Sequence, residues 1–298
     1  MFLKLRGILR AVVRLVVIAT VTYLGGCALV AWKKEGIIFP LHGKERAAKQ
    51  GALPGFETWW MKTPEGEVEA WWRPAEGASA ERPAPAVMVF HGNGELIDDS
   101  RDFAQRWRAL GAHVLLVEYR GYGRSAGEPT IAACKADAAA WFDKLAERAE
   151  VRRELIVAHG FSLGGVFAAE LAGQRAVGGL VLECAPAGLV ESARDRGIWL
   201  VLTREGFDAV KVLRALPTGV PVLITHGQND YVVSQRHGQL LAAARPDARV
   251  VWGKGSHYPL AVTERPELLA ELLAAAKVRA GLPAADKGLA QVAVNSAL

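Results

Sequence analysis

Gly160-Phe161-Ser162-Leu163-Gly164 is the most informative pentapeptide of this chain. It follows an apolar run, Leu155-Ile156-Val157-Ala158, and precedes a helix-like run from Gly165 to Ala172. A strand, a sharp turn with serine at its tip and a helix are the context in which a G-x-S-x-G pentapeptide presents a nucleophile. The turn strains the serine backbone, and the flanking glycines avoid side-chain crowding. At the amino end of the helix, the helix dipole and free N–H groups favour developing negative charge.

Short apolar strands alternate with helical segments from Ala86 onward. Continuous valine, leucine and isoleucine runs predict strands buried on both faces, and the intervening helices predict right-handed crossovers. The fold class is therefore α/β, with a mainly parallel, doubly wound sheet. The expected strands are Val87–Phe90, His113–Glu118, Leu155–Ala158, Gly179–Glu183, Val222–Thr225 and Arg249–Trp252. The expected helices are roughly Asp99–Leu110, Ile131–Ala149, Ser162–Ala172, Ser234–Ala244 and Arg265–Ala280.

An antiparallel hairpin is expected before this alternation. Its strands are Phe56–Lys62 and Val68–Arg73, with Thr63-Pro64-Glu65-Gly66 as the turn. Tryptophans in these strands favour an aromatic cross-strand cluster over a ligand platform. They are Trp59, Trp60, Trp71 and Trp72.

The alternation of apolar strands and helical segments is interrupted between Ala185 and Pro217. In this architecture such an insertion forms a lid over the site, expected here at about residues 187–215. Its length suits only a helix or two, so we expect a modest cap and a fairly open pocket. The main domain is predicted over residues 35–283, with 284–298 as a frayed tail.

The amino-terminal segment, residues 1–34, is predicted to tether the protein to a membrane. Leu15 to Trp32 is uncharged and bounded by Arg14 and Lys33-Lys34, barely long enough to span a bilayer. One interpretation is an uncleaved signal anchor with its amino terminus in the cytoplasm. Another is a signal peptide cleaved before Cys27, because Leu24-Gly25-Gly26-Cys27 resembles a lipobox whose cysteine is lipidated. A buried helix of a soluble domain is the third. Either membrane interpretation places the catalytic domain on the extracytoplasmic side, in the cell envelope.

Composition excludes several classes of protein. Hydrophobic residues are 51% of the chain and charged residues 22%, which suits a sizeable core. The net charge of +5 does not indicate nucleic-acid binding, since much of the excess of basic residues lies at the amino end. Three cysteines, Cys27, Cys134 and Cys184, cannot form a disulfide-rich scaffold. Cys134 and Cys184 are expected in the core, and no metal site is predicted.

A nucleophilic serine needs an adjacent base, and the base needs a carboxylate to orient it. One known order along a chain is nucleophile, acid and histidine, at successive carboxyl ends of strands. Asp230 follows the strand Val222–Thr225, and His257 follows the last strand. Ser162, Asp230 and His257 are therefore the predicted catalytic residues. The less suitable candidates stand before the last strand or away from a carboxyl end: His113, His226, His237, Asp208 and Asp247.

Two backbone N–H groups are predicted to form an oxyanion hole. His91-Gly92-Asn93-Gly94 follows a strand, and by position Asn93 supplies one donor. Leu163, directly after the candidate nucleophile, supplies the other. His91 is interpreted as a residue that holds this loop. The glycine-rich stretch Glu118 to Gly127 lacks the residues of a phosphate loop and is read as a structural turn, with Arg120 in packing or an ion pair.

Four of these motifs together resemble the α/β-hydrolase superfamily, most of all its Bem46-like branch, with serine-aminopeptidase-like hydrolases nearby. They are Phe90-His91-Gly92-Asn93-Gly94, Tyr119-Arg120-Gly121-Tyr122-Gly123-Arg124-Ser125, Gly160-Phe161-Ser162-Leu163-Gly164-Gly165 and His226-Gly227-Gln228-Asn229-Asp230. The similarity covers roughly Ile37 to Ala280.

The resemblance implies the α/β-hydrolase fold and a membrane-associated serine hydrolase. Such an enzyme would cleave small-molecule or lipid-like acyl esters or thioesters without a metal or organic cofactor. The chain lacks the amino-terminal cysteine cluster of the protein-depalmitoylating type, which disfavours that substrate. A peptidase of serine-aminopeptidase type and a catalytically silent envelope binding protein are the alternatives.

Overall fold

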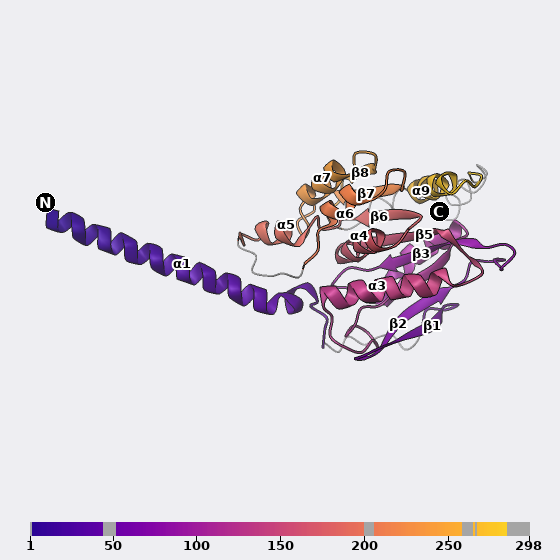
Figure 1. The fold of residues 1–298 in the computed structure, drawn as a ribbon, viewed down its shortest axis with the longest axis horizontal. Helices are drawn as coiled ribbons and strands as arrows, with labels where there is room; N and C mark the ends of the chain where they lie inside the picture. The colour runs from indigo at the N-terminus through magenta and orange to yellow at the C-terminus, as the bar shows by residue number, and fades with distance from the viewer. Residues whose placement is uncertain (1, 44–51, 200–205, 258–264, 266, 285–298) are drawn as a thin grey trace.

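One mixed sheet organises the main domain (Figure 1). The computed structural model describes residues 2–43, 52–199, 206–257, 265 and 267–284. In these residues eight strands form the order β1-β2-β4-β3-β5-β6-β7-β8. They are β1 (Glu57–Thr63), β2 (Gly66–Arg73), β3 (Ala84–Phe90), β4 (His113–Val117), β5 (Val151–Phe161), β6 (Gly179–Glu183), β7 (Val222–Gly227) and β8 (Arg249–Gly253).

The sheet is mainly parallel, as predicted, with the antiparallel hairpin at one edge. β1 pairs with β2 and β2 with β4 in antiparallel fashion, and every later pairing in the described sheet is parallel. In the hairpin, the Trp59 and Trp72 rings stack with centroids 4.8 Å apart. Of the four tryptophans in the predicted cross-strand cluster, these two stack, whereas Trp71 packs in the cluster on the opposite face of the sheet.

Helices cover both faces of the sheet, which explains the continuous apolar strands. On one face, α2 (Arg101–Ala109), after a short 3-10 turn at Ile97–Ser100, and α9 (Glu267–Arg279) pack against one buried cluster. On the other, α3 (Ile131–Ala146), α4 (Leu163–Gln174), α6 (Ala209–Ala215) and α7 (Gln235–Ala244) pack against a second. Within β5, Ile156 belongs to the second cluster and Val157 to the first, because neighbouring strand side chains face opposite ways.

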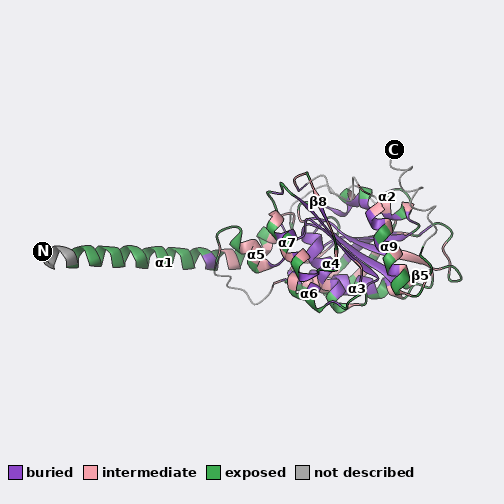
Figure 2. Ribbon diagram, turned by 90° about the horizontal axis from the view of Figure 1, so that it is seen from above, coloured by how far each residue is buried: buried purple, intermediate pink, exposed green. Residues whose placement is uncertain are grey.

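The amino-terminal segment is one helix, α1 (Phe2–Ile38), which projects away from the domain (Figures 1 and 2). From Arg6 to Ile38 it is long and apolar enough to cross a membrane, with a mean hydropathy of 2.0 in its most apolar window. Only 6% of that window is buried, unlike a core helix of a soluble domain. The helix continues past the expected boundary at residue 34. Phe39 then packs in the core against Tyr119, Tyr122 and Phe167.

The expected lid range begins with a short described segment. This segment, called the cap below, consists of α5 (Leu189–Arg194) and the chain that follows to Trp199. α6, at the end of the expected lid range, packs between α4 and α7 and so belongs to the layer that covers the sheet. Residues 200–205 of the expected lid and residues 285–298 of the expected tail lie outside the described residues.

Candidate active site

Ser162 stands at the tip of a strained turn between β5 and α4. Its φ of 51° is in the left-handed region, which among the described non-glycine residues only Cys184 shares. Such a conformation costs about 1–3 kcal/mol and persists where its surroundings over-determine it. Here the Ser162 N–H donates to the Glu183 carbonyl at 2.8 Å, and the Ser162 carbonyl accepts from the Gly165 N–H at 3.0 Å.

The glycines of the pentapeptide are required by close backbone approach. A Cβ on Gly160 would lie 2.2 Å from the Gly164 carbonyl oxygen. A Cβ on Gly164 would lie 2.0 Å from the Phe90 carbonyl oxygen, where α4 meets the end of β3. Neither neighbour is a side-chain end that could move, so the turn excludes any larger residue at both positions.

We expect Gly164→Ala to destabilise the protein by about 3 kcal/mol, because the added methyl group must push α4 away from β3. Urea unfolding measures the change. Gly94→Ala is the matched control, since a Cβ there meets no atom within 4 Å. Equal stabilities of the two variants would contradict the packing argument.

Asp230 and His257 meet at the carboxyl ends of β7 and β8. The His257 Nδ1 donates to Asp230 Oδ2 at 2.7 Å, and Asp230 Oδ1 accepts from the Val232 and Val233 N–H groups, each at 2.9 Å. Burial alone would raise the pKa of Asp230, but the hydrogen bonds from His257 and the backbone hold this pKa below its usual value. The carboxylate is therefore ionised at neutral pH, and it leaves His257 Nε2 as the ring atom that can accept a proton.

The His257 ring packs against Phe161, the residue before Ser162, with ring centroids 5.0 Å apart. Within the described residues no hydrogen bond joins Ser162 Oγ to the His257 ring. Catalytic hydrogen bonds of this kind are often long without substrate and tighten when it binds. The structure thus brings the predicted acid and base into contact, and it packs the residue before the serine against the base.

A cavity of about 230 Å³ lies above Ser162, and Asn93 and Leu163 line it with the serine. Leu163 is the first residue of α4, so its N–H has no acceptor within the helix. In the described part of the chain, the Asn93 N–H also makes no hydrogen bond. Both predicted oxyanion donors therefore border the cavity. A larger hollow of about 540 Å³ beside α6 is lined by neither Ser162 nor Asn93.

Glu118 holds the loop that contains Asn93, a role the sequence did not reveal. His91 Nδ1 lies 2.8 Å from the Gly92 carbonyl oxygen, and His91 Nε2 lies 2.8 Å from Glu118 Oε1. A carbonyl oxygen and a carboxylate both accept hydrogen bonds, so this geometry favours the imidazolium form of His91, in which both ring nitrogens donate. Burial lowers the pKa of His91, but the Glu118 carboxylate outweighs burial and raises it above its usual value. The predicted loop-holding role of His91 matches this geometry.

We expect His91→Asn to reduce stability by about 1.5–3 kcal/mol near pH 6 and by less near pH 9, because the hydrogen bond to a charged partner is lost. A raised folded-state pKa means that the stabilisation is complete below about pH 6.5 and disappears as pH rises through the folded value. Urea unfolding at the two pH values measures the difference.

His113→Asn is the control for this prediction. His113 Nδ1 accepts from the Ala75 N–H at 2.9 Å, so this buried histidine is neutral. Its contribution should not fall with rising pH. A His91 contribution that is equally insensitive to pH would contradict the imidazolium assignment.

The turn from Glu118 to Gly127 is structural, as predicted. The Arg120 guanidinium donates to both Asp137 oxygens, at 2.6 and 2.8 Å. Tyr122 Oη donates to the Asn93 carbonyl oxygen at 2.9 Å. The turn thereby supports the loop beside Ser162.

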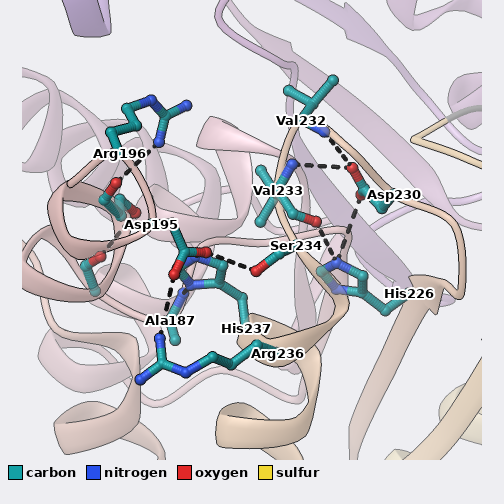
Figure 3. A network of polar contacts seen from close by, with 12 residues as sticks. Ala187, Asp195, Arg196, His226, Asp230, Val232, Val233, Ser234, Arg236 and His237 are labelled. Carbon is teal, nitrogen blue, oxygen red and sulfur yellow. Dashed lines mark hydrogen bonds and ion pairs between the residues drawn. The ribbon is translucent and has the colours of Figure 1, made fainter.

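His237 also lines the cavity, although its sequence position made it a poor candidate for the base. Its Nδ1 accepts from the Ala187 N–H and its Nε2 donates to Asp195 Oδ2, each at 3.0 Å (Figure 3). Asp195, directly after α5, also accepts from Ser234 Oγ at 2.6 Å. Burial lowers the pKa of His237 despite the nearby carboxylate. His237 therefore ties the cap to α7, and no pattern in the sequence marks this contact.

One group of described side chains, Cys184, Asp230 and His257, has possible metal-ligand atoms within 4.8 Å of one another. The sequence did not indicate that Cys184 lies beside a histidine. Burial raises the pKa of the Cys184 thiol, which opposes the thiolate form that binds metals. Both Asp230 oxygens already accept hydrogen bonds. The donor set therefore fits a metal ion poorly.

Comparisons with known proteins agree with this architecture. The family model described as Hydrolase_4, serine aminopeptidase, S33, matches residues 81–205. An uncharacterized protein of Mycobacterium tuberculosis is 30% identical over 84% of this chain and 87% of its own length. Protein bem46 of Schizosaccharomyces pombe is 33% identical over 33% of this chain and 34% of its own length.

Solved structures share the fold at low sequence identity. A thermophilic esterase of Thermogutta terrifontis superimposes with a TM-score of 0.62 at 20% identity, over 81% of this chain and 98% of its own. The Pyrococcus furiosus esterase Pf2001 gives a TM-score of 0.60 at 15% identity, over 80% and 99%. With the sheet order, the strained serine turn and the paired Asp230 and His257, these matches show that the chain belongs to the α/β-hydrolase superfamily.

Proposed function

We propose that the protein is a serine hydrolase of carboxylic esters or thioesters that works through an acyl-enzyme intermediate. The observation that carries the proposal is the position of Ser162. It stands at the strained tip before α4 and lines a cavity, and the residue before it packs against His257 of the Asp230–His257 pair. A serine, a base and an orienting carboxylate are the parts that nucleophilic acyl transfer requires.

The proposed reaction has two steps. His257 Nε2 accepts the Ser162 Oγ proton as the oxygen attacks the substrate carbonyl, while Asp230 stabilises the imidazolium. The Asn93 and Leu163 N–H groups donate to the tetrahedral oxyanion. His257 then protonates the leaving alcohol or thiol, and a water that it activates releases the acid. The cycle requires no metal or organic cofactor.

The lining of the cavity favours esters over the aminopeptidase alternative that the family model suggests. An aminopeptidase must bind the ammonium group of its substrate, for which a carboxylate is the natural partner. The charged residues among the described lining are Lys34 and Arg196, both basic. The described lining offers no carboxylate to hold a free amino terminus, and a neutral ester needs none.

A panel of p-nitrophenyl esters of rising chain length, against aminoacyl anilides, tests the proposal. We expect turnover of the esters and little of the anilides. Preferred hydrolysis of the anilides would favour the peptidase. Hydrolysis of neither would favour a silent binding protein with this fold.

We further propose that α1 tethers the protein to a membrane, with the main domain on the extracytoplasmic side. Its apolar length and the basic residues before it support this orientation. The uncleaved anchor and a form lipidated at Cys27 both keep residues 27–38 at the membrane. If Cys27→Ser abolishes lipid labelling of the protein and changes its migration, the protein is the lipoprotein. If labelling and migration are the same in Cys27→Ser as in the wild type, it is the uncleaved anchor.

A further inference from the structure

The wall of the Ser162 cavity includes the end of α1. Val30, Lys34, Ile37 and Ile38 line the cavity, and their spacing places them on one face of the helix. The Ile38 carbonyl oxygen accepts from Asn93 Nδ2 at 3.1 Å, which joins the helix to the loop beside the serine. The apolar helix is therefore part of the candidate active site as well as an extension from it.

This wall lies where a membrane surface is expected. The uncharged stretch of α1 ends at Trp32, and Lys33 and Lys34 follow. Basic residues at the end of a spanning helix mark the level of the lipid headgroups. Because Val30 precedes this boundary and Ile37 follows it, the cavity straddles the level at which acyl chains meet headgroups.

The cap contacts α1 further into its uncharged stretch. The Trp199 N–H donates to Tyr23 Oη at 2.8 Å, and Tyr23 lies within the uncharged stretch. In both views α5 lies beside the inner end of α1 (Figures 1 and 2). Trp199 is 71% exposed, and Val232, on the cavity lining, is 44% exposed. Exposed aromatic and apolar side chains beside a spanning helix suit insertion into a membrane interface.

The chemistry of the cavity matches a lipid. Most of its described lining is apolar, including Leu189, Ile198 and Phe207, which suits an acyl chain. Arg196 and Lys34, which also pairs with Glu35 at 3.1 Å, supply the charged groups of the lining. Basic side chains at headgroup level attract phosphate.

We propose that the site takes acyl phospholipids directly from the bilayer, with the acyl chain lying along the Val30–Ile38 face of α1. This inference rests on the proposed hydrolase function and names its substrate. As the Ser162 Oγ–acyl bond forms, the lipid ester C–O bond breaks and the proton passes through His257 to the departing lysolipid oxygen. Water then cleaves the acyl-enzyme and releases the fatty acid.

The test uses the full-length protein in phosphatidylcholine vesicles that carry a phospholipid with a fluorogenic long acyl chain. The readout is the ratio of its hydrolysis rate to that of soluble p-nitrophenyl acetate. Val30→Trp narrows the proposed chain path and should lower this ratio about ten-fold, the effect of losing contact with roughly two methylene groups. Leu29→Trp is the matched control, because Leu29 is exposed and does not line the cavity.

An unchanged ratio in Val30→Trp, or an equal fall in Leu29→Trp, would overturn the inference. Wild-type protein that hydrolyses the acetate but not the vesicle lipid would overturn it and leave the proposed function standing. Wild-type protein that hydrolyses neither and takes up no fluorophosphonate would overturn both.

Discussion

Ser162→Ala is expected to lower kcat by roughly 10⁴–10⁶-fold and to abolish burst-phase acylation and fluorophosphonate labelling. The substitution removes the only protein oxygen that bonds to the acyl group in the proposed mechanism. The fold should remain intact, because alanine keeps the Cβ and Ser162 makes no side-chain capping bond to α4. Circular dichroism and urea unfolding check this second expectation.

Ser192→Ala is the matched control for labelling. Ser192 lines the same cavity, but its Oγ donates to the Gly188 carbonyl oxygen at 2.8 Å and has no base beside it among the described contacts. We expect labelling to survive this change. Labelling that survives Ser162→Ala would refute the nucleophile assignment.

Asp230→Asn is expected to lower kcat by about 10⁴-fold while the turn around it persists. The amide oxygen can still accept from Val232 and Val233, but an amide nitrogen facing His257 Nδ1 would favour the wrong imidazole tautomer. Steady-state rates on a p-nitrophenyl ester measure the loss. Asp208→Asn is the control, because Asp208 caps α6 through the Lys211 N–H and lies outside the proposed triad. Comparable rates for the two variants would contradict the role of Asp230.

The lowered pKa of Asp230 adds a pH dependence to this prediction. A carboxyl group whose pKa falls on folding contributes stability above its unfolded pKa of about 3.9 and loses it as pH falls through the folded value. The stability difference between wild type and Asp230→Asn should therefore be largest near neutral pH and shrink in acid. Urea unfolding over this range measures it.

The fold was predictable because its signals are local. Apolar runs and helical segments alternate along the chain, and each predicted strand matches an observed one. The bounds differ where pairing extends a strand past its apolar run. β5 begins at Val151, four residues before Leu155, because Val151 pairs with Ala84 of β3. The register of the two strands then shifts before Ala86 pairs with Ile156. The apolar pattern of one segment does not indicate which strand pairs with it.

The candidate site was predictable only in part. The order of Ser162, Asp230 and His257 at strand ends selected these residues, and the structure places Asp230 and His257 in contact. The sequence did not indicate that Glu118 holds the Asn93 loop or that His237 ties the cap to α7. Their partners, His91 and Asp195, are 27 and 42 positions away in sequence. Pairings at such separation depend on how strands and cap pack, and a single sequence holds no record of that packing.

Residues close together in the chain specify the class of sheet, the turn that presents Ser162 and the apolar character of α1. The packing of distant segments makes the end of α1 a wall of the Ser162 cavity and lets Asp195 tie the cap to α7. These are contacts between distant segments. Burial of shared apolar surface and pairing of buried polar groups select them, and neither leaves a periodic pattern in the chain.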